Sequence, residues 1–316
     1  MSDKKIVYVT GCLGFIGIHI TEACLKRGWY VIGVDKCGYA SLVDRLEHFE
    51  KYSNFRFIKS DINDLDHLYD CDYIINTAAE THVDNSISGS DVFIHSNING
   101  VHRLLELIKI AKERKPILLH FSTDEVYGDT DAGSFTEECL LKPSNPYSAT
   151  KAAADQLILA WSRTFDIPYV IVRPSNNYGI GQYVEKLIPR TIKCVDVGRL
   201  IPLHLQGTPR RTWLHVDDTA NAIIHIIKSG VRNQIYNIAG SYECENREVV
   251  SQILELIFRN QVDLANYCDF SIQRQGVDVR YSIDDTKLKL LGWKPEKQFA
   301  EELPAIVAYY QKNFVW

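Results

Sequence analysis

The chain has 316 residues, of which 46% are hydrophobic and 24% are charged, and its formal net charge is −5. This composition is typical of a soluble globular protein with a large core, and the length suits two domains or one core with an attached lobe. The acidic balance argues against nucleic acid as the main partner, because phosphate binding needs a basic face.

The cysteines and the N-terminus indicate the cellular compartment. The eight cysteines are scattered, without a C-x-x-C pair or a histidine at zinc-ligand spacing. We therefore expect no metal site and mostly buried thiols in a reducing environment. Residues 1–5 lead into an apolar run too short for a signal peptide, and no apolar span reaches the length of a membrane helix. The sequence predicts a cytoplasmic protein.

Short apolar runs alternate with helix-length segments through the first half of the chain. Such strands, separated by helices, are typical of a parallel sheet covered on both faces, and right-handed connections make it a doubly wound α/β fold of the Rossmann type. Long helices are predicted over 91–114 and from about 146 to 165. The predicted strands are 6–10, 31–35, 55–59, 73–78, 117–122 and 169–174.

The regular alternation fades after residue 175. We expect a Rossmann domain over residues 1–175 and a smaller mixed C-terminal lobe over 176–316, with some segments of the lobe returning to the main sheet. The predicted strands of the second half are 203–206, 211–216, 235–239 and 270–273, and the predicted helices are 217–228, 246–260 and 297–312.

A glycine-rich loop, residues 11–17, follows the first strand and opens a helix. Gly11, Gly14 and Gly17 allow a tight turn and a close approach of backbone N–H groups to a pyrophosphate. Asp35 ends the second strand, where an acid binds the hydroxyls of an adenosine ribose and repels a 2′-phosphate. The pattern therefore predicts NAD rather than NADP. Asp61 follows the third strand and either lies near the adenine or caps the next helix.

The G-x-x-G-x-x-G spacing resembles that of the short-chain dehydrogenase/reductase superfamily. This resemblance predicts a Tyr-x-x-x-Lys pair beyond the fifth strand, and Tyr147 and Lys151 stand there. Four residues apart, both side chains lie on one helical face, where Lys151 can lower the pKa of the phenol. The pair is significant because it follows the strand end at Ser122 and Thr123, whereas the spacing alone is common among 17 tyrosines.

Two acids, Asp124 and Glu125, directly follow the fifth strand. One interpretation is a solvated turn. The other is an acid and base pair, because adjacent carboxyl groups in a partly closed cleft can differ in pKa. Hydride transfer needs neither group, whereas elimination of water needs one group to remove a carbon-bound proton and another to protonate the leaving hydroxyl.

An ordered series of segments resembles the nucleotide-sugar 4,6-dehydratases of the extended short-chain dehydrogenase group, which act on dTDP-glucose or UDP-glucose. The resemblance covers about residues 6 to 295, and a series this long is more specific than any single motif. Its segments are 78–87, 122–128, 147–151, 176–179, 185–189, 211–213, 236–238, 276–284 and 291–295.

The resemblance implies a lyase reaction in three parts. Tyr147, helped by Thr123 and Lys151, takes the proton of the glucose 4-hydroxyl as hydride passes from C4 to NAD. Glu125 then removes the C5 proton while Asp124 protonates the departing 6-hydroxyl. Hydride returns to C6, which gives the 4-keto-6-deoxy sugar and regenerates NAD. The two sequence domains accordingly become an NAD-binding domain and a nucleotide-sugar-binding lobe.

The resemblance also implies the binding residues. His82 is expected to be structural or close to the cofactor rather than a base. The implied cofactor contacts are Gly11, Leu13, Gly14, Phe15, Ile16, Gly17, Asp35, Asp61, Ile62, Ala78, Ala79, Asn97, Tyr147 and Lys151. The implied substrate contacts are Glu80, His82, Val83, Asp84, Asn177, Glu185, Lys186, Arg211 and Arg274.

Two segments depart from the family pattern. Residues 178–186 lack two prolines and an aromatic residue of a substrate-covering segment, and Gly181 adds freedom, so we expect a more mobile loop. Residues 273–278 lack a histidine associated with the nucleotide diphosphate. Both changes leave the preference between UDP and dTDP sugars open.

Other readings of the sequence are a sibling enzyme and a protein without catalysis. A nucleotide-sugar 4-epimerase or a UDP-glucuronate decarboxylase does not need Asp124 and Glu125. A catalytically idle NAD-binding sensor does not need Thr123, Tyr147 and Lys151. The family also implies a homodimer formed through the helices at 91–114 and 147–166.

Overall fold

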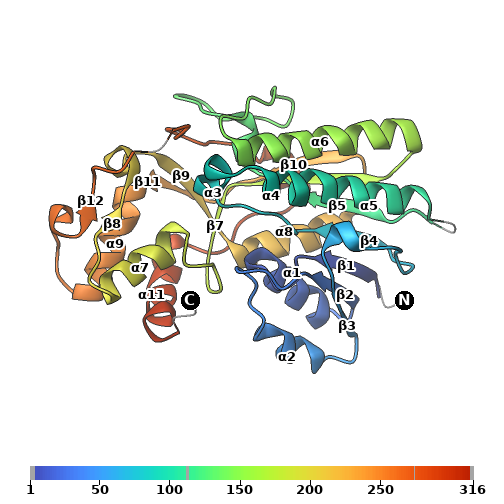
Figure 1. Ribbon diagram of the computed structural model, residues 1–316, viewed down its shortest axis with the longest axis horizontal. Helices are drawn as coiled ribbons and strands as arrows, with labels where there is room; N and C mark the ends of the chain where they lie inside the picture. The colour runs from blue at the N-terminus through green and yellow to red at the C-terminus, as the bar shows by residue number, and fades with distance from the viewer. Residues whose placement is uncertain (1–3, 112–113, 274, 314–316) are drawn as a thin grey trace.

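A seven-stranded sheet forms the centre of the protein (Figure 1). The computed structural model describes residues 4–111, 114–273 and 275–313. All neighbouring strands of this sheet are parallel, in the order β10-β6-β5-β4-β1-β2-β3, so the predicted doubly wound fold is confirmed. The strands are β1 (Ile6–Thr10), β2 (Tyr30–Asp35), β3 (Phe55–Lys59), β4 (Tyr73–Asn76), β5 (Ile117–Phe121), β6 (Tyr169–Pro174) and β10 (Gln234–Ile238).

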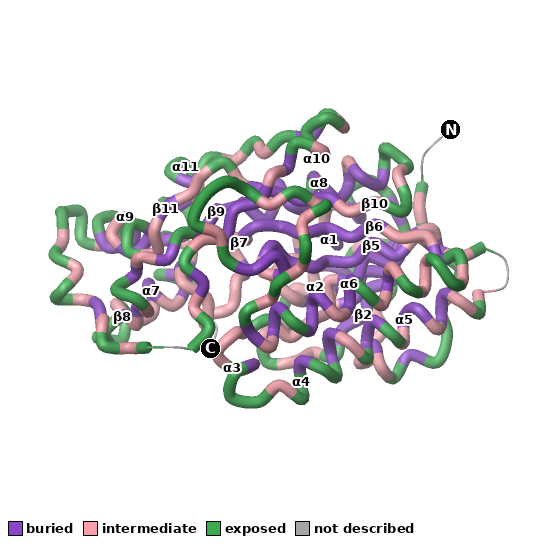
Figure 2. The backbone as a smooth tube through the Cα atoms, turned by 90° about the horizontal axis from the view of Figure 1, so that it is seen from above, coloured by how far each residue is buried: buried purple, intermediate pink, exposed green. Residues whose placement is uncertain are grey.

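Helices cover both faces of this sheet. Because side chains alternate along a strand, Val7 and Val9 of β1 join one core cluster while Tyr8 joins the other. Figure 1 shows one helical layer below the sheet and the other above it, and Figure 2 shows the buried strands between them. The layer below the sheet contains α1 (Phe15–Lys26), α2 (Arg45–Glu50) and α8 (Val216–Ser229). The layer above it contains α5 (Gly100–Lys109) and α6 (Pro146–Phe165).

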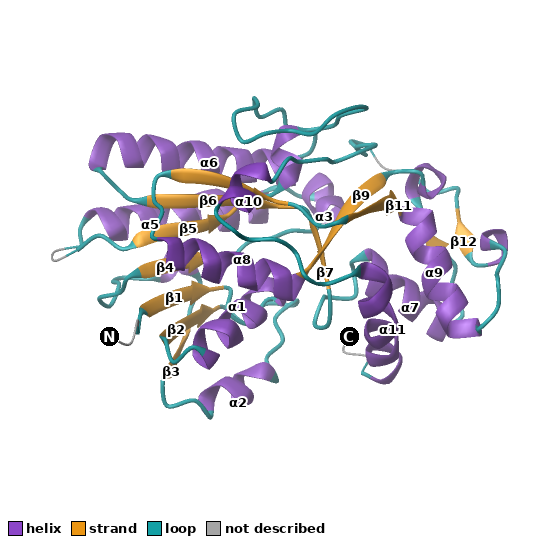
Figure 3. Cartoon of the chain, turned by 180° about the vertical axis from the view of Figure 1, so that it is seen from behind, coloured by secondary structure: helices purple, strands orange, loops and turns teal. Residues whose placement is uncertain are grey.

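A smaller lobe follows β6, and Figure 3 shows it beside the main sheet. Its core includes Tyr178, Trp213 and Phe299. Two small sheets support it, one in the order β11-β9-β7 and one that pairs β12 with β8. The strands are β7 (Asn176–Tyr178), β8 (Ile201–Pro202), β9 (Arg210–His215), β11 (Tyr242–Glu245) and β12 (Cys268–Asp269), and the helices are α7 (Leu187–Asp196), α9 (Asn246–Phe258) and α11 (Phe299–Lys312).

Short helical segments connect these layers. They are η1 (Ile62–Asp64), α3 (Val83–Ser88), α4 (Asp91–Phe93), η2 (Ile94–Asn99), η3 (Asp124–Tyr127), η4 (His204–Gly207), η5 (Leu264–Asn266) and α10 (Thr286–Leu290). The segment η2 is π-helical and joins α4 to α5, which ends at Lys109. The single helix predicted over 91–114 is therefore three consecutive segments, with residues 112–113 outside the described part of the chain.

Two predicted strands of the lobe are wrong. Residues 204–206 fall in η4 and Leu203 is its N-cap; Leu205 and Gln206 have positive φ angles of 47° and 55°, which strands do not adopt. Residues 270–273 are not a strand either, since the pairing with β8 lies just before them at Cys268 and Asp269. Helix α7 was not predicted.

Two further expectations concern the cysteines and the membrane. Cys12, Cys24, Cys71, Cys244 and Cys268 are buried, and the free thiols number eight, all within the described residues. The prediction of mostly buried thiols is thus confirmed. In the described part of the chain, no helix has the length and hydropathy needed to cross a membrane.

Candidate active site

The glycine loop turns the chain from β1 into α1 at the carboxyl edge of the main sheet. Gly11 has a φ of +69°, and a Cβ there would lie 2.8 Å from the Ala78 backbone nitrogen. A Cβ on Gly17 would lie 1.9 Å from the Gly11 carbonyl oxygen, so neither position accepts a side chain. Gly14 caps α1 without a side-chain hydrogen bond, which leaves the first N–H groups of the helix for a ligand. This helix end suits the pyrophosphate of a dinucleotide.

Asp35 ends β2 and is buried beside the glycine loop. Its Oδ1 atom accepts hydrogen bonds from the Cys37 backbone nitrogen at 2.7 Å and the Ser41 hydroxyl at 2.8 Å. Its Oδ2 atom accepts one from the Leu13 backbone nitrogen at 3.0 Å. Because a carboxylate offers about four acceptor positions, these bonds leave room for about one of the two ribose hydroxyls that the sequence assigns to Asp35.

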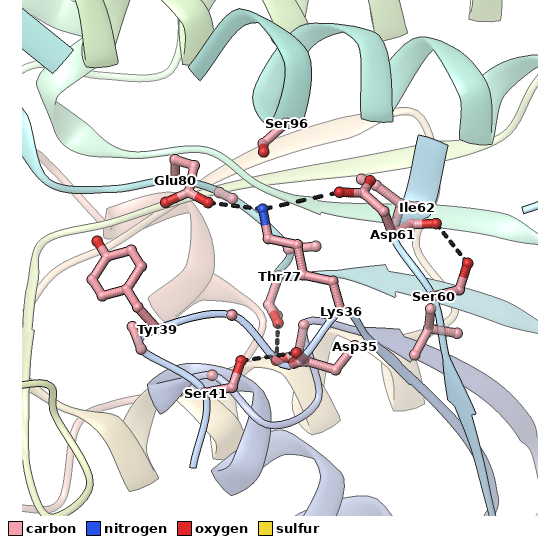
Figure 4. A pocket seen from close by; sticks show the side chains of 17 residues that line it. Asp35, Lys36, Tyr39, Ser41, Ser60, Asp61, Ile62, Thr77, Glu80 and Ser96 are labelled. Carbon is pink, nitrogen blue, oxygen red and sulfur yellow. Dashed lines mark hydrogen bonds and ion pairs between the residues drawn. The ribbon is translucent and has the colours of Figure 1, made fainter. Parts of the chain in front are cut away.

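The cavity next to the end of β2 contains a lysine between two acids (Figure 4). The Nζ atom of Lys36 lies 2.9 Å from Glu80 Oε1 and 3.9 Å from Asp61 Oδ2. Asp61 also caps η1, since its Oδ1 accepts a hydrogen bond of 2.9 Å from the Asn63 backbone nitrogen. The cap interpretation of Asp61 is therefore confirmed, and its contact with the adenine stays a prediction. Glu80, expected at the substrate, lies in this cavity instead.

A second cavity continues from the first along the carboxyl edge of the sheet. The two share Gly14, Ala40, Thr77 and Ala79. Among the predicted residues, the second cavity is lined by Phe15, Ile16, Gly17, Thr123, Asp124, Glu125, Tyr147, Asn177, Glu185 and Lys186. A ligand that lies across the glycine loop thus reaches the acids and the tyrosine through one opening.

The two acids sit in a capped turn after β5. Thr123 caps η3, because its hydroxyl accepts a hydrogen bond from the Glu125 backbone nitrogen at 3.3 Å. The same hydroxyl donates to Asp124 Oδ1 at 3.2 Å. Asp124 is only 3% exposed, which excludes a solvated turn. Turn-forming residues therefore build the turn while its acids face the cavity.

The acids have different electrostatic surroundings. Burial and the neighbouring Glu125 raise the pKa of Asp124 to about 7, and among the described residues its Oδ2 atom has no hydrogen-bond partner. Burial also raises the pKa of Glu125, but the charges of Arg211 and Lys186 oppose this shift. Asp124 is therefore suited to hold a proton near neutral pH, and Glu125 has two cations that favour its carboxylate form.

Helix α6 brings Tyr147 to the same cavity. Asn145 caps the helix and forms a capping box with Ser148, and Pro146 occupies the first turn. These residues fix the start of the helix at the sheet edge, so Tyr147 lies in its first turn and Lys151 one turn later. Both side chains are buried, with 7% and 2% exposure.

The electrostatics of Tyr147 differ from the sequence prediction. Burial and the negative charge of Glu125 raise the pKa of the phenol, while the Thr123 hydroxyl opposes this shift. Burial also lowers the pKa of Lys151, to about 8. The negative charge of Asp155 opposes this change.

Asp155 belongs to a buried ion pair below the active site. Its Oδ2 atom accepts hydrogen bonds from Arg173 Nε at 3.1 Å and from Arg173 Nη2 at 2.9 Å. Ser122, the last residue before Thr123, donates to the same oxygen at 3.0 Å. The pair is 0% and 2% exposed and ties α6 to β6 beneath Lys151. The sequence analysis missed it, because Arg173 falls within a strand without a motif.

A third cavity extends toward the lobe. Lys186 donates to the Thr81 carbonyl at 3.0 Å and lies 3.2 Å from Glu185. Arg211 donates to the Asp278 carbonyl at 3.0 Å, and its guanidinium group lies 4.2 Å from the centre of the Tyr281 ring. Predicted residues that line this cavity are His82, Val83, Asp84, Glu125, Asn177, Glu185, Lys186 and Arg211.

Among the described residues, Leu13, Asn97 and Lys151 were predicted at the site but do not line these cavities. Asn97 is 1% exposed. Its Oδ1 atom accepts a hydrogen bond from the Glu80 backbone nitrogen at 2.9 Å, and its Nδ2 atom donates one to the Thr150 hydroxyl at 2.9 Å. Its contacts therefore support the cavity from behind. Leu13 is buried and contributes its backbone N–H to Asp35. Arg274 lies outside the described residues.

Comparison with known proteins gives the same assignment as the geometry. A family profile described as GDP-mannose 4,6 dehydratase matches residues 8–305. The chain belongs to this family. It is 38% identical to a dTDP-glucose 4,6-dehydratase of Haemophilus influenzae, over 97% of this chain and 98% of that protein. It is 39% identical to the low-salt glycan biosynthesis protein Agl12 of Haloferax volcanii, over 96% of this chain and 98% of that protein.

Solved structures of the dehydratase type have the same fold. The dTDP-glucose 4,6-dehydratase DesIV of Streptomyces venezuelae, crystallised with NAD and TYD, has a TM-score of 0.91 and 36% identity, over 98% of this chain and 97% of that chain. A UDP-glucuronic acid 4-epimerase of Bacillus cereus reaches a TM-score of 0.89 at 26% identity, over 97% of this chain and 99% of that chain. The fold alone thus does not separate the two activities.

The 178–186 loop of this 4,6-dehydratase family member is held at both sides. The His19 ring lies 2.9 Å from the Ile180 carbonyl, and the Tyr310 hydroxyl donates to the Gln182 carbonyl at 2.8 Å. Gly181 has a φ of +95°, and a Cβ there would lie 2.9 Å from Ile18. The glycine that led us to expect mobility serves here as a close-packing position.

Proposed function

We propose that the protein is an NAD-dependent nucleotide-sugar 4,6-dehydratase that removes water from dTDP-glucose or UDP-glucose. The observation that carries the proposal is the acid pair after β5. Asp124 has a pKa of about 7 and lies beside Glu125 in the cavity that also contains Tyr147. An epimerase has no use for a protonated acid and a base at this place, whereas dehydration needs both.

The cofactor proposal rests on the charge of the first cavity. Its described lining residues include Asp35, Asp61 and Glu80, against one cation, Lys36. A ribose 2′-phosphate would enter an acidic site, so the lining favours NAD over NADP. The free N–H groups at the start of α1 suit the pyrophosphate. Bound NAD would accept a hydride from C4 of the sugar and return a hydride to C6.

We assign the first proton transfer to Tyr147 and the elimination to the two acids. Tyr147 takes the proton of the 4-hydroxyl, with Thr123 beside it and Lys151 one helical turn away. Oxidation at C4 makes the C5 hydrogen acidic. Glu125 takes that hydrogen as a proton, and Asp124 gives its own proton to the departing 6-hydroxyl. Each positioned acid or base contributes about 10²–10⁴ to the rate.

The third cavity is the proposed nucleotide site. Lys186, Arg190 and Arg211 line it, and such cations pair with the oxygens of a diphosphate. We therefore assign the cofactor to residues 1–175 and most nucleotide contacts to residues 176–316. Arg274, an expected diphosphate contact, stays a prediction from the sequence.

The assembly and location are further proposals. The helices at 91–114 and 147–166 are the proposed surface of a homodimer, and the exposed apolar side chains of Val92 and Ile94 on this stretch support it. Val92→Asp should then convert a dimer to a monomer in light scattering, and an unchanged mass would exclude this surface. We also propose a cytoplasmic location.

The activity test uses the purified protein without added cofactor. Incubated in turn with dTDP-glucose, UDP-glucose and GDP-mannose, it should convert one of the two glucose nucleotides to a product lighter by one water in mass spectrometry. An unchanged mass for all three would contradict dehydration. A C4 epimer of unchanged mass, detected by NMR, would support the epimerase instead.

A further inference from the structure

Glu125 has a partner that the proposed reaction does not use. The hydroxyl of Tyr281 lies 3.4 Å from Glu125 Oε2 and also donates a hydrogen bond to Asp278 Oδ2. Tyr281 and Asp278 are 3% and 4% exposed, respectively. A phenol thus lies between two carboxyl groups, and it lines the third cavity beside the proposed base.

This chain of contacts continues to the surface. The hydroxyl of Ser144 donates to the same Asp278 Oδ2 atom, and Ser144 is exposed. The series Glu125, Tyr281, Asp278 and Ser144 therefore connects the cavity to solvent through side chains that can each exchange protons. Ser144 directly precedes the N-cap of α6, so this exit lies on the outer side of the helix that carries Tyr147.

The segment that carries Tyr281 is fixed on both sides. Asp129 accepts hydrogen bonds from the backbone nitrogens of Val279 at 3.0 Å and Arg280 at 2.8 Å. The guanidinium group of Arg211 stacks on the Tyr281 ring at 4.2 Å. These contacts leave the phenol little freedom to leave its position between the two acids.

The proposed reaction gives Glu125 a proton that has two possible fates. Glu125 takes it from C5 during elimination, and C5 needs a proton again after hydride has reached C6. If Glu125 is sealed beneath the sugar, the same hydrogen returns to C5. If Glu125 exchanges its proton before that step, C5 receives a hydrogen from water.

We propose that Tyr281 and Asp278 form a proton route between Glu125 and solvent. In the outward step, the O–H bond of protonated Glu125 breaks and its proton binds the Tyr281 oxygen, while the phenolic proton of Tyr281 moves to the Asp278 carboxylate. Asp278 then releases a proton to water near Ser144. The reverse sequence brings a proton from water back to Glu125. No electrons move. The route rests on the proposed dehydratase activity, because only that reaction protonates Glu125 at each turnover.

The test measures where the C5 hydrogen of the product comes from. The reaction is run in D₂O with unlabelled substrate, and NMR measures deuterium at C5 of the keto sugar. The wild-type product should carry deuterium at C5. Tyr281→Phe, which removes the hydroxyl and keeps the ring, should yield product that retains mostly protium at C5. The matched control Tyr52→Phe changes a tyrosine that packs against the core and is not among the residues lining the three cavities, and it should label like the wild type.

A second variant and a second readout cover the case in which Tyr281→Phe unfolds or is inactive. Asp278→Asn keeps an acceptor oxygen for Tyr281 but cannot take up a proton from it. When finished product is incubated with enzyme in D₂O, this variant should exchange the C5 hydrogen at least about tenfold more slowly than the wild type, since each positioned proton acceptor contributes about 10²–10⁴.

The outcomes separate the route from the activity. Wild-type labelling of C5 in Tyr281→Phe or in Asp278→Asn would overturn the route, and so would a wild-type product that retains protium at C5. A wild-type enzyme that removes no water would contradict the proposed function itself. A lowered melting temperature without a change in C5 labelling would assign Tyr281 a structural role only.

Discussion

The two halves of the cleft are built in different ways. On the cofactor side, short stretches at the ends of β1, β2 and β5 place their side chains at one sheet edge, so each stretch contributes almost independently. On the substrate side, the Arg211 guanidinium, the Tyr281 ring and the Asp278 backbone hold one another from distant parts of the chain. The cofactor half therefore depends on local turns, and the substrate half on a network of long-range contacts.

This contrast has consequences for mutation. A change at a local motif should remove one chemical function and leave the neighbouring ones intact. A change in the long-range network should affect several properties together. The variants below, from the largest expected effect to the smallest, test this difference.

Glu125→Gln should have the largest effect on the overall reaction. The amide cannot take the C5 proton, so formation of the keto sugar should fall by about 10²–10⁴. C4 oxidation depends on Tyr147 and should persist, which would appear as accumulating absorbance of reduced nicotinamide. Normal turnover in this variant would show that another group is the base. Glu137→Gln, a substitution of an acid outside the three cavities, serves as the matched control.

Asp155→Asn should have the largest effect on stability. It leaves Arg173 buried without its carboxylate, and breaking a buried pair costs about 3–5 kcal/mol. The melting temperature should drop clearly. The double variant Asp155→Asn with Arg173→Met should recover part of the loss, because it removes the unpaired charge. Equal melting temperatures for the wild type and the single variant would mean that the pair contributes little.

Asp124→Asn should change how stability depends on pH. The pKa of Asp124 is raised from 3.8 to about 7, so the folded protein keeps a proton that the unfolded chain releases. The stability from this carboxyl is fully present below pH 3.8 and is lost as the pH rises toward 7. The variant should therefore gain melting temperature relative to the wild type between pH 4 and pH 8. A constant difference across this range would contradict the raised pKa.

Lys36→Ala and Arg211→Met should separate the two halves most directly. Lys36 contacts only the cofactor cavity, so its loss should weaken NAD retention and leave the KM for the sugar nucleotide nearly unchanged. Loss of Arg211 should raise that KM by about tenfold or more, because a charge-assisted hydrogen bond contributes about 1.5–3 kcal/mol. Arg211→Met should also lower kcat, since the Arg211 charge favours the carboxylate form of Glu125. Equal effects of both variants on KM would contradict the division.

The predictability of each region follows the same contrast. The sheet, the glycine loop and the placement of Tyr147 were predicted from the sequence, because apolar periodicity, glycine spacing and a helix cap act within a few residues. The acids were identified from their position after β5. Their unequal pKa shifts depend on burial, and on Arg211 and Lys186 far along the chain, which no local pattern specifies.

The lobe was less predictable for physical reasons. Its short strands β8 and β12 have two residues each, so they carry little periodic signal. The positive φ angles of η4 occur at Leu205 and Gln206, residue types that seldom mark such turns. The position of Tyr281 beside Glu125 joins residues 156 positions apart, which a sequence shows only through the fold.

Substrate labelled with deuterium at C4 of the glucose tests the central claim most directly. The protein, as purified and without added cofactor, is incubated with dTDP-glucose or UDP-glucose carrying this label, and the product is analysed by NMR and mass spectrometry. The account predicts a product lighter by one water with the deuterium on C6, because one active site removes and returns the same hydride. Deuterium still on C4 of an epimer, or a dehydrated product without deuterium on C6, would contradict it.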